Sequence, residues 1–106
     1  MAKDAKKISN EIPSPGEIDK IVHEPGRLSI LSHLYVVEEA DFIFIKNQTG
    51  MTWGNLSSHI SKLEEVGYVD VKKEFKGKKP LTMLKLSEKG RKAFEEYKNV
   101  ISGFLK

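Results

Sequence analysis

The chain has 106 residues, enough for one domain with a modest core, and its apolar and charged fractions are those of an ordinary globular protein. It contains no cysteine, which excludes disulfides and thiolate metal sites. Its three histidines are scattered without the spacing of metal ligands, so we expect neither a metal nor another cofactor. A net charge of +3 is by itself weak evidence for a nucleic-acid partner.

No apolar run approaches the ~18 residues that a membrane span requires. The N-terminus also lacks the apolar region of a signal peptide. We therefore expect a cytoplasmic protein with no membrane partner.

The first 16 residues are polar and end in Pro13-Ser14-Pro15-Gly16, a composition typical of a flexible segment. After this point the apolar residues recur with the regular spacing of helices and strands. We expect residues 17–106 to form the folded domain, with residues 1–16 as a flexible N-terminal segment.

Three helices are predicted in the first half of the chain, over residues 17–23, 25–38 and 41–49. Pro25 suits the first position of the second helix, where a missing amide costs nothing. The third helix begins with four apolar residues that would also fit a strand, but the preceding Asp41 is a good helix cap.

The clearest helix pattern covers residues 52–66. Its first residue is a threonine, which caps well, and Gly67 suits the left-handed position that follows a helix end. Leu56, Ile60 and Leu63 fall at i, i+4 and i+7, so they form one narrow apolar stripe. The three residues before this helix make a turn of the length found in helix-turn-helix motifs.

The opposite face of this helix is unusual for a solvated surface, which normally carries good helix formers such as Glu, Lys, Arg and Gln. It carries instead Gly54, Asn55, Ser57, Ser58, Ser61, Lys62 and Glu65. Short polar side chains allow a close approach to another surface, and they suit a helix that lies in a DNA major groove. A serine-rich solvent face is the alternative.

Residues 69–85 alternate between apolar and polar side chains, which predicts two strands joined by a turn at residues 76–79. Six lysines and two acidic residues give this segment a net charge of +4, more than that of the whole chain. A lysine-rich hairpin tip either discourages edge-to-edge strand pairing or contacts phosphate. Beside the serine-rich helix, the phosphate role is favoured.

Ser87 is expected to cap a last helix, over residues 87–105. Its apolar residues recur at intervals of three, four and three, the seam of a helix that pairs with another helix. The predicted dimer interface consists of Phe94, Tyr97, Ile101, Phe104 and Leu105. The alternative is that this helix folds back on its own domain.

Three segments, T-W-G-N-L-S-S-H-I-S-K-L-E-E-V-G-Y-V, F-K-G-K-K-P-L-T and L-S-E-K-G-R-K-A-F, together resemble small prokaryotic winged-helix transcriptional regulators of the MarR/ArsR-like group. The similarity covers roughly residues 21–97. It implies an α+β, mostly α fold: a winged helix-turn-helix with a two-stranded β wing and a long C-terminal dimerisation helix. Metal sensing of the kind found in some ArsR-like proteins has no visible ligand set here.

We therefore predict a sequence-specific regulator that binds double-stranded DNA as a homodimer on a palindromic site. Residues 52–66 would enter the major groove, with Asn55 able to pair with an adenine edge, and the wing would contact phosphate. The predicted DNA-binding residues are Thr52, Trp53, Asn55, Ser57, Ser58, Ser61, Lys62, Lys76, Lys78 and Lys79.

Two further DNA contacts are left open by the residue pattern. An N-terminal arm could bind through Lys3, Lys6 and Lys7, although such a segment is more often disordered. His59 lies near the buried stripe of its helix, so it either orients that helix or contacts DNA.

The alternative function is a winged-helix protein–protein interaction module of a transcription or other macromolecular assembly, with an acidic partner for the wing. An enzyme is not expected, because no carboxylate stands with a histidine or nucleophile in a recognisable arrangement. No residue pattern indicates a small-molecule effector. A pocket between the dimerisation helices and the DNA-binding part is where one would be sought.

Overall fold

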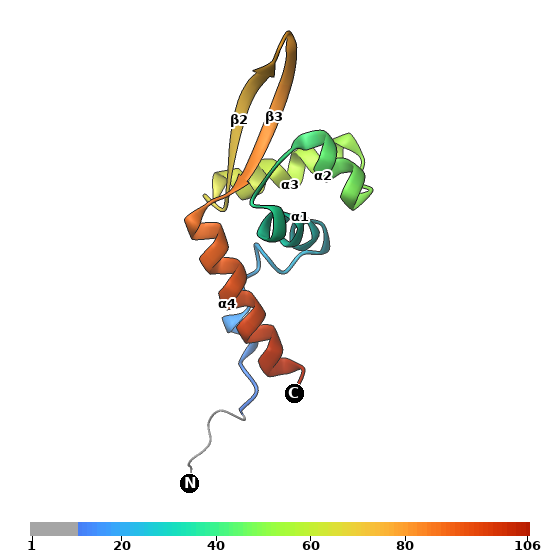
Figure 1. The fold of residues 1–106 in the computed structure, drawn as a ribbon. Coiled ribbons are helices and arrows are strands. Elements are labelled where there is room, and N and C mark those ends of the chain that lie inside the picture. The colour runs from blue at the N-terminus through green and yellow to red at the C-terminus, as the bar shows by residue number, and fades with distance from the viewer. Residues whose placement is uncertain (1–10) are drawn as a thin grey trace.

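Within residues 11–106 the fold consists of four α-helices and a three-stranded antiparallel sheet, shown in Figure 1. The computed structural model describes residues 11–106, so the lysines of the expected N-terminal arm lie outside the described residues. The elements are η2 (Pro15–Glu17, a 3₁₀ turn), α1 (Pro25–Val37), β1 (Glu39–Asp41), α2 (Phe42–Thr49), α3 (Trp53–Glu65), β2 (Val69–Lys76), β3 (Lys79–Leu86) and α4 (Glu88–Phe104). Helices α1 to α3 cluster together, the β2–β3 hairpin projects to one side of them, and α4 extends to the other (Figure 1). Among the described helices, none combines the length and the apolar character needed to cross a membrane.

Helix starts follow the capping residues that the sequence predicts. Asp41, Thr52 and Ser87 each accept a hydrogen bond from the backbone amide three residues further on, at 2.8 to 3.2 Å. Each bond satisfies an amide that has no partner inside its helix. The helices predicted over residues 25–38 and 41–49 are confirmed, and the strand alternative for the start of α2 is not found.

The helix predicted over residues 17–23 is wrong. Within the described residues, the short η2 turn ends at Glu17, where this segment begins, and the chain then runs through turns to α1. The Asp19 carboxylate accepts hydrogen bonds from the amides of Ile21 and Val22, at 2.9 and 3.2 Å. The Asp19 side chain thus gives these two amides the hydrogen-bond partners that a helix would otherwise provide. The turn is therefore favoured over a very short helix.

The two-stranded wing is present, but the sheet has a third strand that the sequence does not predict. Its order is β1-β3-β2, and Ala40 of β1 pairs with Leu84 of β3. Glu38 turns the chain from α1 into β1 with a φ of 70°, and its carbonyl accepts a hydrogen bond from the Leu86 amide at 3.0 Å. The three residues of β1 are Glu-Ala-Asp, types of low strand propensity, so only their pairing with β3 makes them a strand.

The core lies where α1, α3 and the base of the hairpin meet. The predicted stripe of α3 is buried there, with Leu56 and Leu63 fully inaccessible and Ile60 almost so. The other fully buried side chains are Val22, Ile30, Leu31, Leu34, Ile45, Val69 and Leu84. One hydrophobic cluster therefore joins α1, α2 and α3 to the sheet.

The hairpin is joined to α4 by a tight backbone contact at Gly90. The Ser87 amide donates to the Tyr68 carbonyl at 3.0 Å, and a Cβ built at Gly90 would overlap the same carbonyl oxygen. Tyr68 is held in turn by its hydroxyl, which donates to Asp19 at 2.6 Å. Burial, together with this hydrogen bond and the charge of Asp19, raises the pKa of Tyr68 to about 12, so the hydroxyl keeps its proton at neutral pH.

Gly90→Ala is expected to lower the free energy of unfolding by about 1–3 kcal/mol, because the added methyl group meets backbone that cannot rotate away. Urea unfolding followed by far-UV circular dichroism measures this. Gly54→Ala on α3 is the matched control, since outside its own turn of helix no atom lies within 4 Å of the added methyl group. That variant should gain up to ~1 kcal/mol from helix propensity. A Gly90→Ala protein as stable as the wild type would contradict the tight contact.

Candidate nucleic-acid interface

The outward face of α3 is open to solvent along its whole length. The helix residues predicted to contact DNA are all exposed: Trp53, Asn55, Ser57, Ser58, Ser61 and Lys62, with Thr52 exposed at the cap. The apolar stripe on the other side is buried in the core. The structure therefore brings this part of the predicted set together on one accessible surface.

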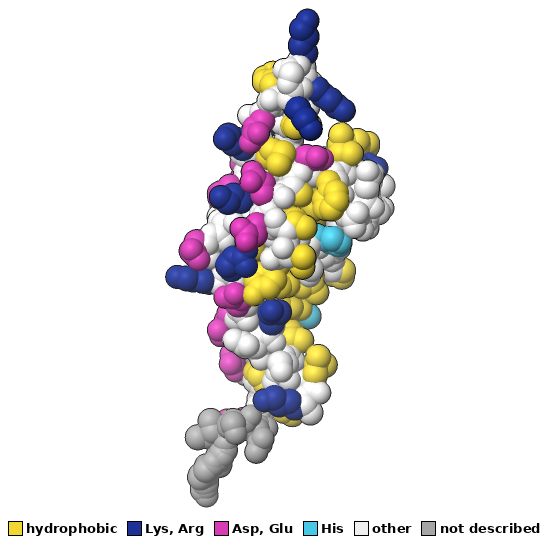
Figure 2. Space-filling model, viewed as in Figure 1, with side chains coloured by type: hydrophobic (Ala, Val, Ile, Leu, Met, Phe, Trp, Pro, Cys, Tyr) yellow, Lys and Arg dark blue, Asp and Glu magenta, His cyan; other side chains and the backbone are white. Residues whose placement is uncertain are grey.

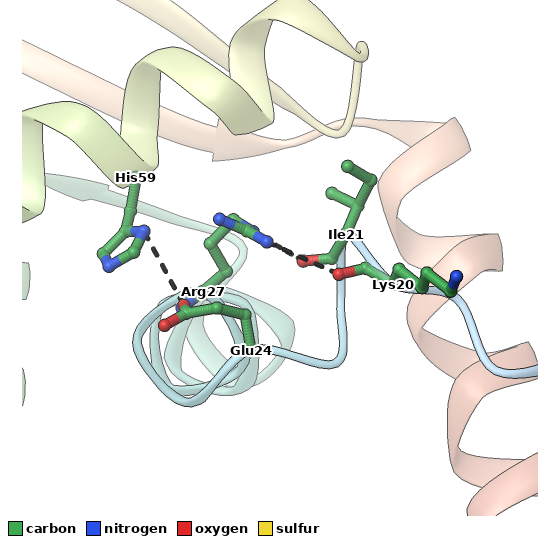
Figure 3. Close-up of polar contacts among 5 residues, drawn as sticks. All are labelled: Lys20, Ile21, Glu24, Arg27 and His59. Atoms are coloured by element: carbon green, nitrogen blue, oxygen red, sulfur yellow. Dashed lines mark hydrogen bonds and ion pairs between the residues drawn. The ribbon is translucent and has the colours of Figure 1, made fainter.

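His59 lies on the inner side of α3, against the start of α1 (Figure 3). Its Nδ1 is 3.6 Å from Oε1 of Glu24, the residue that caps α1. A Cβ at Gly26 would overlap the imidazole ring, so the lack of a side chain there lets the ring sit on the α1 backbone. These contacts match the orienting role considered for His59.

Arg27 fixes the segment that precedes α1. Its Nε donates to the Ile21 carbonyl at 2.6 Å, and a terminal nitrogen reaches the Lys20 carbonyl at 3.4 Å (Figure 3). The guanidinium thus supplies partners for carbonyl groups of an irregular segment. Arg27 thus holds the segment before α1 in place, while Glu24 makes the contact with α3.

An aromatic pair stands at the N-terminal end of α3. Trp53 is 56% exposed and stacks on Phe42 of α2, with ring centroids 5.5 Å apart and an interplanar angle of 4°. The Lys46 ammonium lies 5.1 Å from the centre of the Trp53 ring. Lys46 was not predicted as a DNA contact, yet it places a positive charge beside a helix N-terminus, where anions bind favourably.

The wing carries its lysines at the tip. Gly77 takes a φ of 66° and, with Lys78, makes the two-residue turn, while Lys76 and Lys79 face each other across the strands. In Figure 2 basic side chains gather at this end of the molecule, and acidic ones appear only further down the hairpin. The three predicted wing lysines therefore lie together at the hairpin tip, away from α3.

A cleft of about 480 Å³ separates α3 from the wing and the start of α2. Trp53, Ser57 and Ser61 line it from the helix, whereas Lys73 and Thr82 line it from the wing. Lys73 and Thr82 are opposite one another in the strand register. Neither was predicted, although strand alternation places Lys73 on the same face as the buried Val69 and could have identified it.

A family model described as "Winged helix DNA-binding domain" matches residues 27–105. The chain belongs to the winged helix DNA-binding domain family. The match covers the helix-turn-helix, the wing and α4.

The chain is also similar to individual proteins. Over 78 residues the chain is 40% identical to the uncharacterized protein MJ0432 of Methanocaldococcus jannaschii, an alignment that covers 74% of this chain and 85% of that protein. A transcriptional regulator homologue from Pyrococcus horikoshii superposes with a TM-score of 0.78 at 28% identity, covering 82% of this chain and 86% of that one. The structure of NadR in complex with 4-hydroxyphenylacetate has the same fold, with a TM-score of 0.68 at 23% identity, covering 82% of this chain and 62% of that chain. The similarity to winged-helix transcriptional regulators predicted from the sequence is confirmed.

The structure divides the residues of the predicted dimer interface into two groups. Phe94 and Tyr97 are buried within one chain: the Phe94 ring lies 5.0 Å from that of Tyr35, and the Tyr97 hydroxyl is 2.7 Å from Nδ1 of His23. The last turn of α4 is more open. Ile101 and Phe104 are half-buried there, and Leu105 is 79% exposed.

Proposed function

We propose that this winged-helix protein regulates transcription by binding specific sites on double-stranded DNA, with α3 in the major groove. The observation that carries the proposal is the exposed face of α3, lined with short polar side chains, in a domain whose family binds DNA. An α-helix fits the major groove of B-form DNA, and amide and hydroxyl groups on its first turns can pair with base edges. Asn55 is the side chain proposed to read sequence.

The backbone between two DNA grooves would cross the cleft between α3 and the wing. When a helix occupies the major groove and a wing reaches past it, the intervening sugar-phosphate strand must lie between them. Lys73 and the hydroxyl groups of Ser57, Ser61 and Thr82 line this cleft. Their donors suit phosphate, and the lysines of the wing tip would extend the contact along the strand.

The proposal includes a homodimer that pairs through the last turns of α4. Phe104 and Leu105 end that helix, and Ile12 is 70% exposed in the N-terminal segment, where Pro13 packs against Gly103 of α4. These side chains form an apolar surface away from α3 and the wing. Two-fold pairing there would present two copies of α3 to a palindromic site.

Asn55→Ala and Lys78→Ala should weaken binding in different ways. Loss of a base contact costs affinity for the selected site more than for random duplex, whereas loss of a phosphate contact weakens both about equally. Lys78→Ala should also lower the slope of log K against log salt by about one. Fluorescence anisotropy with selected and random duplexes, at several salt concentrations, measures both effects. Equal losses on the two duplexes for Asn55→Ala would remove it as the reader.

Lys73→Ala should weaken binding to any duplex more than Lys72→Ala does. Lys73 lines the cleft, whereas its neighbour Lys72 points to the other face of the strand and lies 3.8 Å from Glu74. Both variants remove one charge, so a difference between their affinities for duplex reports the position of the lysine and not the net charge. The same anisotropy titrations apply. Equal losses would show that the strand does not cross the cleft.

A double variant, Phe104→Glu with Leu105→Glu, should shift the protein from dimer to monomer, because four like charges would meet at the paired helix ends. Sedimentation velocity gives the mass. Val36→Glu is the control, since Val36 is 80% exposed on α1. A wild-type protein that is monomeric at the concentrations where it binds DNA would exclude the dimer.

A further inference from the structure

Strand β1 forms one edge of the sheet, and its outer side is unpaired. The Leu86 amide of β3 donates to the carbonyl of Glu38, the residue just before β1, so the backbone groups of Glu38 point toward β3. Along an antiparallel strand this direction alternates from one residue to the next. The amide and carbonyl of Glu39 and the amide of Asp41 therefore point away from β3, and no strand of the described residues lies beyond them.

A groove of about 340 Å³ lies beside this edge. The three residues of β1 line it, together with Val37, Phe44 and Met83. Val37 and Phe44 are 42% and 40% exposed, so an apolar side chain placed against them would remove apolar surface from water. A free strand edge beside an apolar groove suits an extended segment, which pairs through its backbone and places alternate side chains in pockets.

The edge carries negative charge. Glu38 and Glu39 are exposed and Asp41 is half-buried, and the ion pairs found among the described residues involve none of the three. Lys85 lies opposite Glu39 in the strand register and offsets one of these charges. The β1 edge of a second copy would bring like charges together, whereas a segment with lysine or arginine would be attracted.

The groove and the cleft beside α3 lie on different faces of the sheet. Met83 lines the groove and is opposite Lys72 in the register, whereas its neighbour Thr82 lines the cleft and is opposite Lys73. Successive side chains of a strand point to opposite faces, which separates the two surfaces even though Asp41 borders both. A partner in the groove leaves the exposed face of α3 uncovered.

We propose that the β1 edge and its groove bind an extended segment of another protein that combines apolar with basic side chains. The free backbone groups select the extended conformation, the groove selects apolar side chains, and the carboxylates select lysine or arginine. The bound segment adds a fourth strand beside β1. This surface is separate from the proposed DNA contacts, and the proposal does not depend on DNA binding.

The probe is obtained from a display library of random twelve-residue peptides, selected on the immobilised protein without DNA. We expect enriched peptides that combine β-branched or aromatic residues with lysine or arginine and lack acidic residues. The peptide enriched most is synthesised with a fluorescein label, and its dissociation constant is measured by fluorescence anisotropy. Failure to enrich any sequence, or enrichment of acidic peptides, would overturn the assignment.

Two neighbouring residues of α2 provide a matched pair of variants that locates the peptide. Phe44 lines the groove, whereas Ile43 is 46% exposed and lines the cleft beside α3. Phe44→Ser should weaken peptide binding about tenfold, the effect of losing one aromatic contact at an interface. Ile43→Ser should leave it unchanged, and far-UV circular dichroism checks that both variants fold. The reverse pattern would place the peptide in the cleft and overturn the proposal.

The charge of the edge is tested with Glu39→Lys, for which Glu96→Lys on the exposed side of α4 is the matched control. Both variants change the net charge by the same amount. Glu39→Lys should weaken peptide binding about tenfold, because it places a like charge beside the basic side chains of the peptide. Glu96→Lys should have little effect. Equal losses would indicate attraction to the whole protein and would remove the edge as the binding site.

The backbone pairing is tested with two N-methylated versions of the peptide, methylated on its odd or on its even residues. An added strand pairs with β1 through the amides of alternate residues only. One version should therefore lose binding, and the other should bind like the unmethylated peptide. Equal affinities of the two versions would overturn the addition of a strand at β1.

Discussion

Burial of one face of α3 is the interaction on which the rest of this structure depends. Leu56, Ile60 and Leu63 pack into the cluster formed by α1 and the base of the hairpin. Fully burying an aliphatic side chain of this size contributes about 1.5–3 kcal/mol, so three of them account for a large part of a small domain's stability. Because this energy comes from the inner face, the outer face is free to carry glycine, asparagine and serine.

The polar support of α3 acts in a different way from its apolar packing. Hydrophobic contacts are not directional, so they hold a helix against the core without setting its rotation closely. The contact between His59 and Glu24 lies at one point along the helix, above Gly26. It adds a polar contact between α3 and the start of α1 to the apolar packing that already determines which face of α3 points outward.

The cleft beside α3 is lined by both polar and apolar side chains. Its hydroxyl groups and Lys73 can bind phosphate, while its floor is an aromatic and aliphatic surface.

Several features follow from the sequence alone, because they depend on local chemistry. The caps Asp41, Thr52 and Ser87, the buried stripe of α3 and the hairpin turn at Gly77 are each set by residues a few positions apart. The winged-helix fold and the exposed face of α3 were predicted from these signals and from the resemblance to known regulators. The DNA contacts assigned to that face stay predictions.

Other features were decided only by tertiary structure. Strand β1 exists because β3 provides its hydrogen-bond partners, and the segment before α1 stays irregular because Asp19, Tyr68 and Arg27 hold it. Phe94 and Tyr97 are covered by their own chain because α4 packs on α1 and on the segment before it, while Gly90 lets the start of α4 lie against the Tyr68 carbonyl. The cleft with Lys73 arises from segments that are remote in sequence, and spacing within one element cannot reveal such a site. Local patterns determine which face of an element is apolar, but the assembled fold determines what each face meets.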